Sequence, residues 1–230
     1  MSLQNRVDPF GRIVADPGRG TLTGNRGILH DDHRRVVRSH ASPAWITCVL
    51  EWRGRRRAVM VGRTWTELFF LDEATALAAG HRPCAYCRRR DYDAFVGAWS
   101  RGNPALAPTS GRRAPVVDRV LHGERRTSHG EKRVWSASAR SLPPGAMISL
   151  SAVPNLVVER GLMRPWSFSG YGSPQGLPDS TVDVLSPRTI VEAIRSGYRP
   201  GMHPSAGDQG SMRPAVVNTV SEENRSATRS

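Results

Sequence analysis

The 230-residue chain has little cysteine, with only Cys48, Cys84 and Cys87 present. Three thiols cannot all pair, so the sequence argues against a secreted fold that is held together by disulfides. Long apolar runs are also missing, because no segment approaches the ~20 apolar residues that cross a bilayer, and no apolar segment follows the N-terminal residues. We therefore expect a soluble, cytoplasmic protein without a membrane partner.

Hydrophobic residues are scarce for a compact fold, at 38% of the chain. Glycine and proline are abundant instead, with 22 and 17 residues, and this composition predicts many loops and turns. A chain of 230 residues is still long enough to bury a core in one large domain or two small ones.

Acidic residues are outnumbered by basic ones, 20 to 33, which gives a net charge of +13. Lysine is almost absent, because every basic residue except Lys132 is an arginine. An arginine excess can follow from genome base composition, but a charge this far from zero attracts polyanions whatever its origin. Such polyanions are DNA, RNA and anionic lipid surfaces, and of these we expect a nucleic acid, or else a phosphorylated ligand, as the partner.

The N-terminal part of the chain predicts turns followed by a β-hairpin. Residues 1–40 show little periodicity, whereas residues 45–52 are rich in β-branched and aromatic side chains and predict a strand. Residues 53–55 predict a turn and residues 57–61 a return strand, so the hairpin has a basic tip. A further strand is expected over residues 66–71.

Two helices are expected next. Asp72 predicts the N-cap of a helix over residues 73–79, which Gly80 ends. The second helix is expected from Cys87 to Ser100. Four of its residues have the spacing of one buried helix face, namely Tyr92, Phe95, Val96 and Trp99.

Beyond residue 100 the sequence predicts short elements joined by polar segments. In chain order we expect a linker over residues 101–113, a helix over 115–124, a mobile basic stretch over 125–141, two strands within 146–160, a strand over 182–185 and a helix over 187–196 capped by Ser186.

Residues 80–88 read Gly-His-Arg-Pro-Cys-Ala-Tyr-Cys-Arg and place two thiols two residues apart where a helix is expected to begin. A Cys-x-x-Cys turn aims both sulfurs at one point and supplies half of a zinc site, while nearby positive charge favours the thiolate. We expect zinc as the cofactor, with Cys48, Cys84 and Cys87 as ligands. The fourth ligand stays open between His81, an acid, water and the other histidines, of which His30, His33, His40 and His122 are candidates.

Residues 70–88, which run Phe-Leu-Asp-Glu-Ala-Thr-Ala-Leu-Ala-Ala-Gly-His-Arg-Pro-Cys-Ala-Tyr-Cys-Arg, resemble the zinc-binding domain of Ada-type DNA-repair proteins. The resemblance implies zinc held by four cysteines, contact with the DNA backbone, and an upstream cysteine that accepts a methyl group. This chain offers Cys48 alone upstream, so the zinc–thiolate centre carries one negative charge fewer and its sulfur is less nucleophilic. A structural or substrate-orienting zinc is therefore favoured over a methyl acceptor.

These features predict an α+β fold, with a small zinc knuckle on a β-hairpin and a C-terminal α+β portion with short strands. We expect an Ada-like zinc-knuckle region over residues 1–100, a C-terminal region over 114–203 and a disordered tail over 204–230, which lacks apolar periodicity.

The leading functional hypothesis is a zinc-stabilised nucleic-acid-binding protein that acts in DNA repair or processing. Zinc would fix the knuckle, so that one basic face meets the phosphates. The arginines expected on that face are Arg82, Arg88, Arg89 and Arg90.

Two alternatives stay open. A zinc-dependent hydrolase or transferase with an open metal position would use His122 as a base and Asp118, four residues earlier on one helix face, to orient it. The same two residues are also compatible with a solvated pair of no catalytic role. The other alternative is a protein-interaction module in which the knuckle is purely structural.

Overall fold

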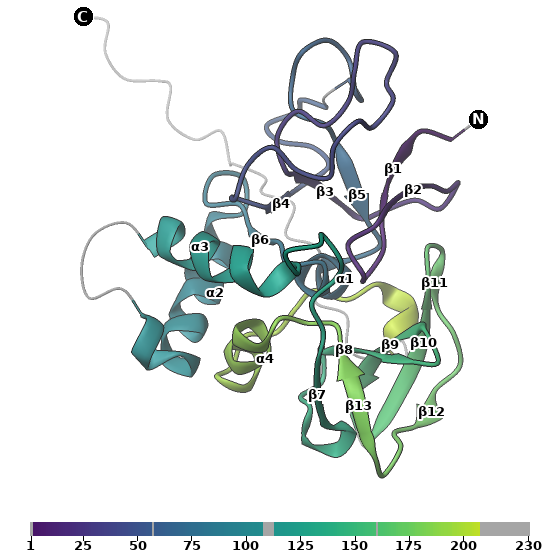
Figure 1. The fold of residues 1–230 in the computed structure, drawn as a ribbon, viewed down its shortest axis with the longest axis vertical. Coiled ribbons are helices and arrows are strands. Elements are labelled where there is room, and N and C mark those ends of the chain that lie inside the picture. Colours follow the sequence, from purple (N-terminus) through teal and green to yellow (C-terminus); the bar gives the residue numbers. More distant parts are fainter. Residues whose placement is uncertain (1, 57, 108–112, 160, 208–230) are drawn as a thin grey trace, which may run out of the picture.

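The computed structural model describes residues 2–56, 58–107, 113–159 and 161–207. Within these residues the fold is α+β, as expected, with a six-stranded and a seven-stranded sheet and four α-helices (Figure 1). None of the described helices is long and apolar enough to pass through a membrane.

The N-terminal sheet has the strand order β2-β1-β5-β3-β4-β6. Its strands are β1 (Gln4–Val7), β2 (Ile13–Ala15), β3 (Leu22–Asn25), β4 (Ile46–Cys48), β5 (Leu68–Phe70) and β6 (Arg82–Pro83). The strand expected over residues 66–71 is therefore confirmed as β5. Residues 1–40, which show little periodicity in the sequence, contain three strands of this sheet, namely β1, β2 and β3.

The expected β-hairpin is not found among the described residues, because residues 58–61 belong to no strand, while residue 57 lies outside the described residues. β4 pairs antiparallel with β3 on one side and parallel with β6 on the other, so neither edge is free for a return strand. The basic turn does exist, with positive φ at Arg53 and Gly54, but the chain then enters a second turn with positive φ at Met60 and Gly62. The strand pattern was visible in the sequence, but the partner strands come from distant segments.

Helix α1 (Glu73–Ala78) lies between the two sheets (Figure 1), and all six of its residues are buried. Its expected cap is confirmed, since the Asp72 side chain accepts a hydrogen bond from the Thr75 N–H at 2.8 Å. Gly80 ends the helix with a φ of +88°, a conformation that glycine adopts without strain. The small side chains of this helix allow both sheets to approach it closely.

Helices α2 (Arg89–Gly102), α3 (Arg113–Arg125) and α4 (Arg188–Arg195) lie together beside the sheets (Figure 1). The buried face expected for α2 is confirmed, because all four of its predicted residues belong to the cluster formed with α3 and α4. The helix begins at Arg89, two residues later than expected. Ser186 is not the cap of α4, since its hydroxyl accepts a hydrogen bond from the Met147 N–H instead. This cluster joins residues from both sides of the domain boundary expected near residue 100.

The C-terminal sheet has the strand order β11-β10-β9-β8-β13-β7, with β12 paired to β10. Its strands are β7 (Trp135–Ser138), β8 (Met147–Leu150), β9 (Val153–Val158), β10 (Leu162–Ser167), β11 (Gly170–Tyr171), β12 (Gln175–Gly176) and β13 (Thr181–Val184). The expected strands β8, β9 and β13 are confirmed.

Two expectations for the C-terminal part are corrected. The stretch 125–141, expected to be mobile, contains β7, whose Trp135 lies opposite Val184 of β13. The tail expected to be disordered from residue 204 begins with a 3-10 helix, Pro204–Ala206, whose Ala206 is buried. Residues 208–230 lie outside the described residues.

The enclosure of α1 gives a direct stability prediction. Ala76 is fully buried between the N-terminal sheet and the rest of the protein. We expect Ala76→Leu to lower the free energy of unfolding by about 1–3 kcal/mol, because extra methyl groups overpack a filled core. The matched control is Ala94→Leu on the exposed side of α2, which we expect to change it by less than about 0.5 kcal/mol. Chemical denaturation measures both, and equal midpoints for the two variants would contradict a tightly enclosed α1.

Candidate metal centre

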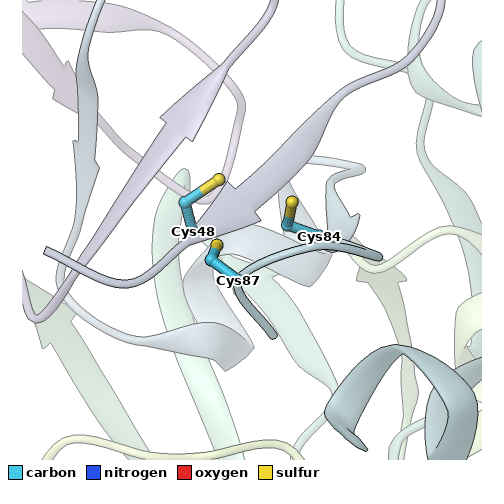
Figure 2. A group of neighbouring side chains, drawn as sticks. All are labelled: Cys48, Cys84 and Cys87. Carbon is cyan, nitrogen blue, oxygen red and sulfur yellow. The ribbon is translucent and has the colours of Figure 1, made fainter. Parts of the chain in front are cut away.

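Cys48, Cys84 and Cys87 form one cluster, with their sulfur atoms all within 4.8 Å of one another (Figure 2). Zinc–sulfur bonds of about 2.3 Å in a tetrahedral site place sulfur atoms roughly 3.8 Å apart. The cluster therefore has a size and a donor chemistry that fit a metal–thiolate site. The three expected cysteine ligands therefore lie together in space, although β5, α1 and β6 separate Cys48 from Cys84 along the chain.

The pairing of β4 with β6 brings the cysteines together. In this parallel pair Ile46 lies beside Arg82 and Thr47 beside Pro83, so the next residues along the two strands are Cys48 and Cys84. The Cys84 N–H donates to the Thr47 carbonyl at 2.9 Å and extends the register to the first ligand of the turn.

Backbone N–H groups point at the sulfur atoms. The Tyr86 N–H donates to Cys84 Sγ at 3.4 Å, and Cys84 also accepts from the Cys87 N–H. Hydrogen bonds from the Cys48 and Cys87 thiols, followed by these backbone bonds, lower the pKa of Cys84. The same contact with Cys84 raises the pKa of Cys48. Donors arranged around sulfur in this way favour a thiolate, which is the form that binds a metal.

Arg88 links the segment that contains Cys48 to the turn that contains Cys84 and Cys87. Its side chain is buried and donates to the Thr47 hydroxyl at 2.9 Å, next to Cys48, and to the Glu73 carboxylate at 2.8 Å. Glu73 lies in α1, so this link ties the cysteine turn to the centre of the fold. Arg88 is thus an internal residue, and the sequence-based expectation of an exposed phosphate contact does not match its position.

Arg82 is also internal. Its guanidinium donates two hydrogen bonds to the Asp118 carboxylate, at 2.8 and 2.7 Å, and both side chains are less than 10% exposed. The expected basic face therefore does not contain Arg82 and Arg88, because each satisfies a buried carboxylate. Arg89 and Arg90 are exposed, as expected for surface contacts, and Arg89 also pairs with Asp93.

His81 does not belong to the cysteine cluster. It is fully buried, its Nε2 accepts from Arg26 Nε at 3.1 Å, and its ring packs against Phe70 with centroids 4.6 Å apart. Burial, followed by the nearby Arg26 and Arg125 charges, holds its pKa well below the usual range. His81 and Cys84 are three residues apart in extended chain, so their side chains point to opposite faces.

His122 and Asp118 do not form the expected base and orienting carboxylate. Asp118 points to Arg82, and no hydrogen bond joins it to His122 within the described residues. His122 is exposed, and its ring lies edge-on to His40 with centroids 5.5 Å apart. Asp118 and His122 do lie four residues apart on helix α3, but the Asp118 carboxylate accepts its hydrogen bonds from the buried Arg82.

The described residues offer no fourth Cys, His, Asp or Glu ligand to the cluster. A tetrahedral ion held by these three sulfurs keeps one position for water or another small ligand. Three thiolates on a divalent ion also leave the centre with a single negative charge.

A pair of aromatic rings adjoins the cluster, one exposed and one half-buried. Tyr86, inside the Cys-x-x-Cys turn, is 67% exposed, and its ring centroid lies 5.7 Å from that of Trp52. The guanidinium of Arg53 lies 5.5 Å from the Trp52 ring. We call Trp52, Arg53, Tyr86, Arg89 and Arg90 the knuckle surface. Sequence reasoning expected Arg89 and Arg90 on such a surface but missed the aromatic pair, because Trp52 fits a strand pattern. The aromatic Tyr86 between two metal-binding cysteines was a usable signal.

Comparisons of the chain with protein-family profiles, with curated proteins and with solved structures find no match.

The cysteine cluster predicts one metal ion per chain, and zinc is the ion that we expect. We expect Cys48→Ser, Cys84→Ser and Cys87→Ser each to lower zinc affinity and to weaken the sulfur-to-cobalt charge-transfer band of the cobalt-substituted protein, because each removes one thiolate. Tyr86→Ser is the matched control, since it changes the turn without removing a sulfur. Elemental analysis and absorption spectroscopy provide the readouts. Unchanged affinity in Cys48→Ser would remove Cys48 from the ligand set.

The Arg82–Asp118 pair gives a second prediction. Asp118→Asn leaves a buried guanidinium without its counter-charge, so we expect the free energy of unfolding to fall by about 3–5 kcal/mol. Asp93→Asn breaks the exposed pair with Arg89 and is expected to cost less than about 1 kcal/mol. Denaturant titration compares them. Similar decreases for both variants would mean that the Asp118 site is well solvated.

Proposed function

We propose that the protein is a zinc-stabilised nucleic-acid-binding protein, with a role in DNA repair or processing. One observation carries the proposal: three cysteine sulfurs converge at the turn that holds the exposed Tyr86, whose ring lies near the half-buried Trp52 and its neighbour Arg53. The net charge of +13 supports a polyanionic partner.

Zinc has a structural task in this proposal. The ion would join the end of β4 to the turn that precedes α2, two segments held otherwise by short strand pairing and by Arg88. Zinc–thiolate bonds of this kind contribute directly to folding free energy. A fixed turn keeps Tyr86 beside Trp52.

The knuckle surface has the two components that nucleic-acid binding needs. The side chains of Arg53, Arg89 and Arg90 are exposed and suited to phosphate contacts. The exposed Tyr86 ring, with the half-buried Trp52 ring beside it, is suited to stacking on a base, a contact that tolerates any sequence. The buried Arg82 and Arg88 fix the chain on either side of the cysteine turn through their hydrogen bonds to Asp118 and to Thr47 and Glu73. They therefore hold the knuckle surface in place without belonging to it.

The resemblance of residues 70–88 to Ada-type zinc domains supports DNA as the first ligand to test. Methyl transfer to Cys48 is not part of the proposal, because three thiolates leave the centre less electron-rich than four. Zinc therefore holds the surface rather than supplying the nucleophile.

A second candidate function rests on the position that the described residues leave open on the metal. A zinc ion held by three thiolates supplies a Lewis acid and an activated water, which is the chemistry of a hydrolase or transferase. His122 does not lie in the cysteine cluster, so its expected role as base has no support from the geometry. Cleavage or transfer activity that disappears on zinc removal and is restored by zinc would favour this candidate.

Binding to DNA tests the leading proposal. We expect log K for a fluorescent oligonucleotide to fall linearly with log salt concentration. The double variant Arg89→Gln/Arg90→Gln should reduce the slope by about one unit for each phosphate that is no longer neutralised. We expect Tyr86→Ala to weaken binding to a single strand about 5- to 150-fold, because each base stack contributes about 1–3 kcal/mol.

Arg140→Gln is the matched control for this experiment. Arg140 is exposed and pairs with Asp179 near the C-terminal sheet, so the variant removes the same charge far along the chain from the knuckle surface. Affinity that does not depend on salt, or equal decreases for Arg140→Gln and for an Arg90→Gln single variant, would contradict a specific role of the knuckle surface.

A further inference from the structure

Two adjoining cavities, of about 540 and 220 Å³, lie away from the cysteine cluster. Both are lined by Ser39, Trp45, Arg125, Arg126 and Gly130, so they lie side by side, and we call them together the basic cavity. No cysteine is among the described residues that line it. The larger part has the volume of an ordinary small-ligand pocket.

Positive charge surrounds this cavity. Arg125, Arg126 and Lys132 line it, and the fully buried Arg26 lies behind it, against the Trp45 ring at 3.8 Å. Arg125 lies against the same ring at 4.5 Å. The acidic side chain among the described lining residues is Glu131, which is exposed to solvent.

Arg125 has a polar atom without a partner. Its side chain is 1% exposed, and it donates through Nε to the Gly80 carbonyl and through Nη1 to the Pro43 carbonyl, both at 2.7 Å. Its Nη2 has no hydrogen-bond partner among the described residues. A buried, unpaired donor on a charged group is costly, so such groups ordinarily meet an acceptor. Arg125 lines the cavity, so an anion bound there would lie beside this guanidinium.

Lys132 adds a second indication. It is the only lysine of the chain, in which all other basic residues are arginines. Its ammonium group donates to the Ala78 carbonyl, at the end of α1. Burial, followed by the charges of Arg26 and Arg125, lowers the pKa of Lys132 to about 7. The Asp8 and Glu124 carboxylates oppose this lowering only in part. An anion bound beside Lys132 would further favour its charged form.

We propose that the basic cavity binds the phosphate group of a nucleotide-sized ligand, with Arg125, Arg126 and Lys132 as its contacts. A guanidinium fork next to an ammonium group suits the several oxygens of a phosphate better than a single carboxylate. The remaining volume, with Trp45 in its wall, accommodates the rest of such a ligand. A free mononucleotide and the terminal phosphate of a nucleic acid present the same chemistry. The site does not depend on the metal centre or on the knuckle surface.

The single lysine makes the test specific. In protein labelled with 13C-lysine, the side-chain signals report Lys132 alone, and we expect them to shift saturably as pyrophosphate is added at constant ionic strength. Thermal unfolding in the same buffers should show a rise in Tm with pyrophosphate but not with an equal ionic strength of chloride.

Matched variants separate binding from general charge screening. Arg126→Gln removes a cavity contact, and we expect pyrophosphate affinity to fall at least about tenfold, as expected when one charge-assisted hydrogen bond is removed. Arg133→Gln removes the same charge from an exposed neighbour that does not line the cavity, and we expect no decrease. No Lys132 shift, or equal decreases in affinity for the two variants, would overturn the proposal.

A third variant distinguishes phosphate binding by Lys132 from a purely structural role of this residue. Lys132→Met keeps the length of the side chain but removes its charge. We expect a Tm in phosphate-free buffer equal to or above that of the parent protein, together with disappearance of the pyrophosphate-induced rise. A lowered Tm with an unchanged rise would overturn the proposal.

Binding measurements with oligonucleotides and with a mononucleotide identify which kind of molecule carries the phosphate. Tighter binding of a 5′-phosphorylated oligonucleotide than of the same oligonucleotide with a 5′-hydroxyl supports the end of a nucleic acid as the natural ligand. Equal binding of both oligonucleotides, with tighter binding of a mononucleotide, supports a free nucleotide. Neither result depends on zinc, so failure here is distinguishable from failure of the proposed function.

Discussion

The enclosure of α1 is the constraint on which the rest of the structure depends. This six-residue helix is buried on every side and contributes to three of the four apolar clusters. Because no face of it meets solvent, its one acidic side chain, Glu73, needs buried partners. It finds them in Arg88, in the Tyr198 hydroxyl at 2.6 Å and in the Gly201 N–H at 2.9 Å. A single carboxylate thus joins the cysteine turn to the C-terminal half of the chain.

The cysteine cluster follows from this arrangement. The chain turns at Gly80 after α1 and continues into β6. Because β6 pairs with β4, Cys84 lies beside Cys48. Arg88 completes the link by contacting Thr47 and Glu73 at once. The arginines near the cysteines therefore divide into two groups, because those that meet buried carboxylates support the fold and those in the first turn of α2 remain at the surface.

Local signals in the sequence predicted the parts of the fold that local physics decides. The cap at Asp72, the stop at Gly80 and the buried face of α2 depend on residues within one or two helix turns. The hairpin failed because β4 pairs with segments more than twenty residues away, which periodicity cannot report. The three cysteines were found by type and spacing, whereas the burial of Arg82 depends on Asp118, which lies 36 residues further along the chain.

The central claim is that three cysteines hold one zinc ion and leave its fourth position to a small ligand. X-ray absorption at the zinc edge of the purified full-length protein tests this most directly. The account predicts three sulfur neighbours at about 2.3 Å and one lighter oxygen or nitrogen neighbour at about 2.0–2.2 Å. A protein that retains no zinc after dialysis against zinc-containing buffer, or a zinc ion with fewer than three sulfur neighbours, would contradict it.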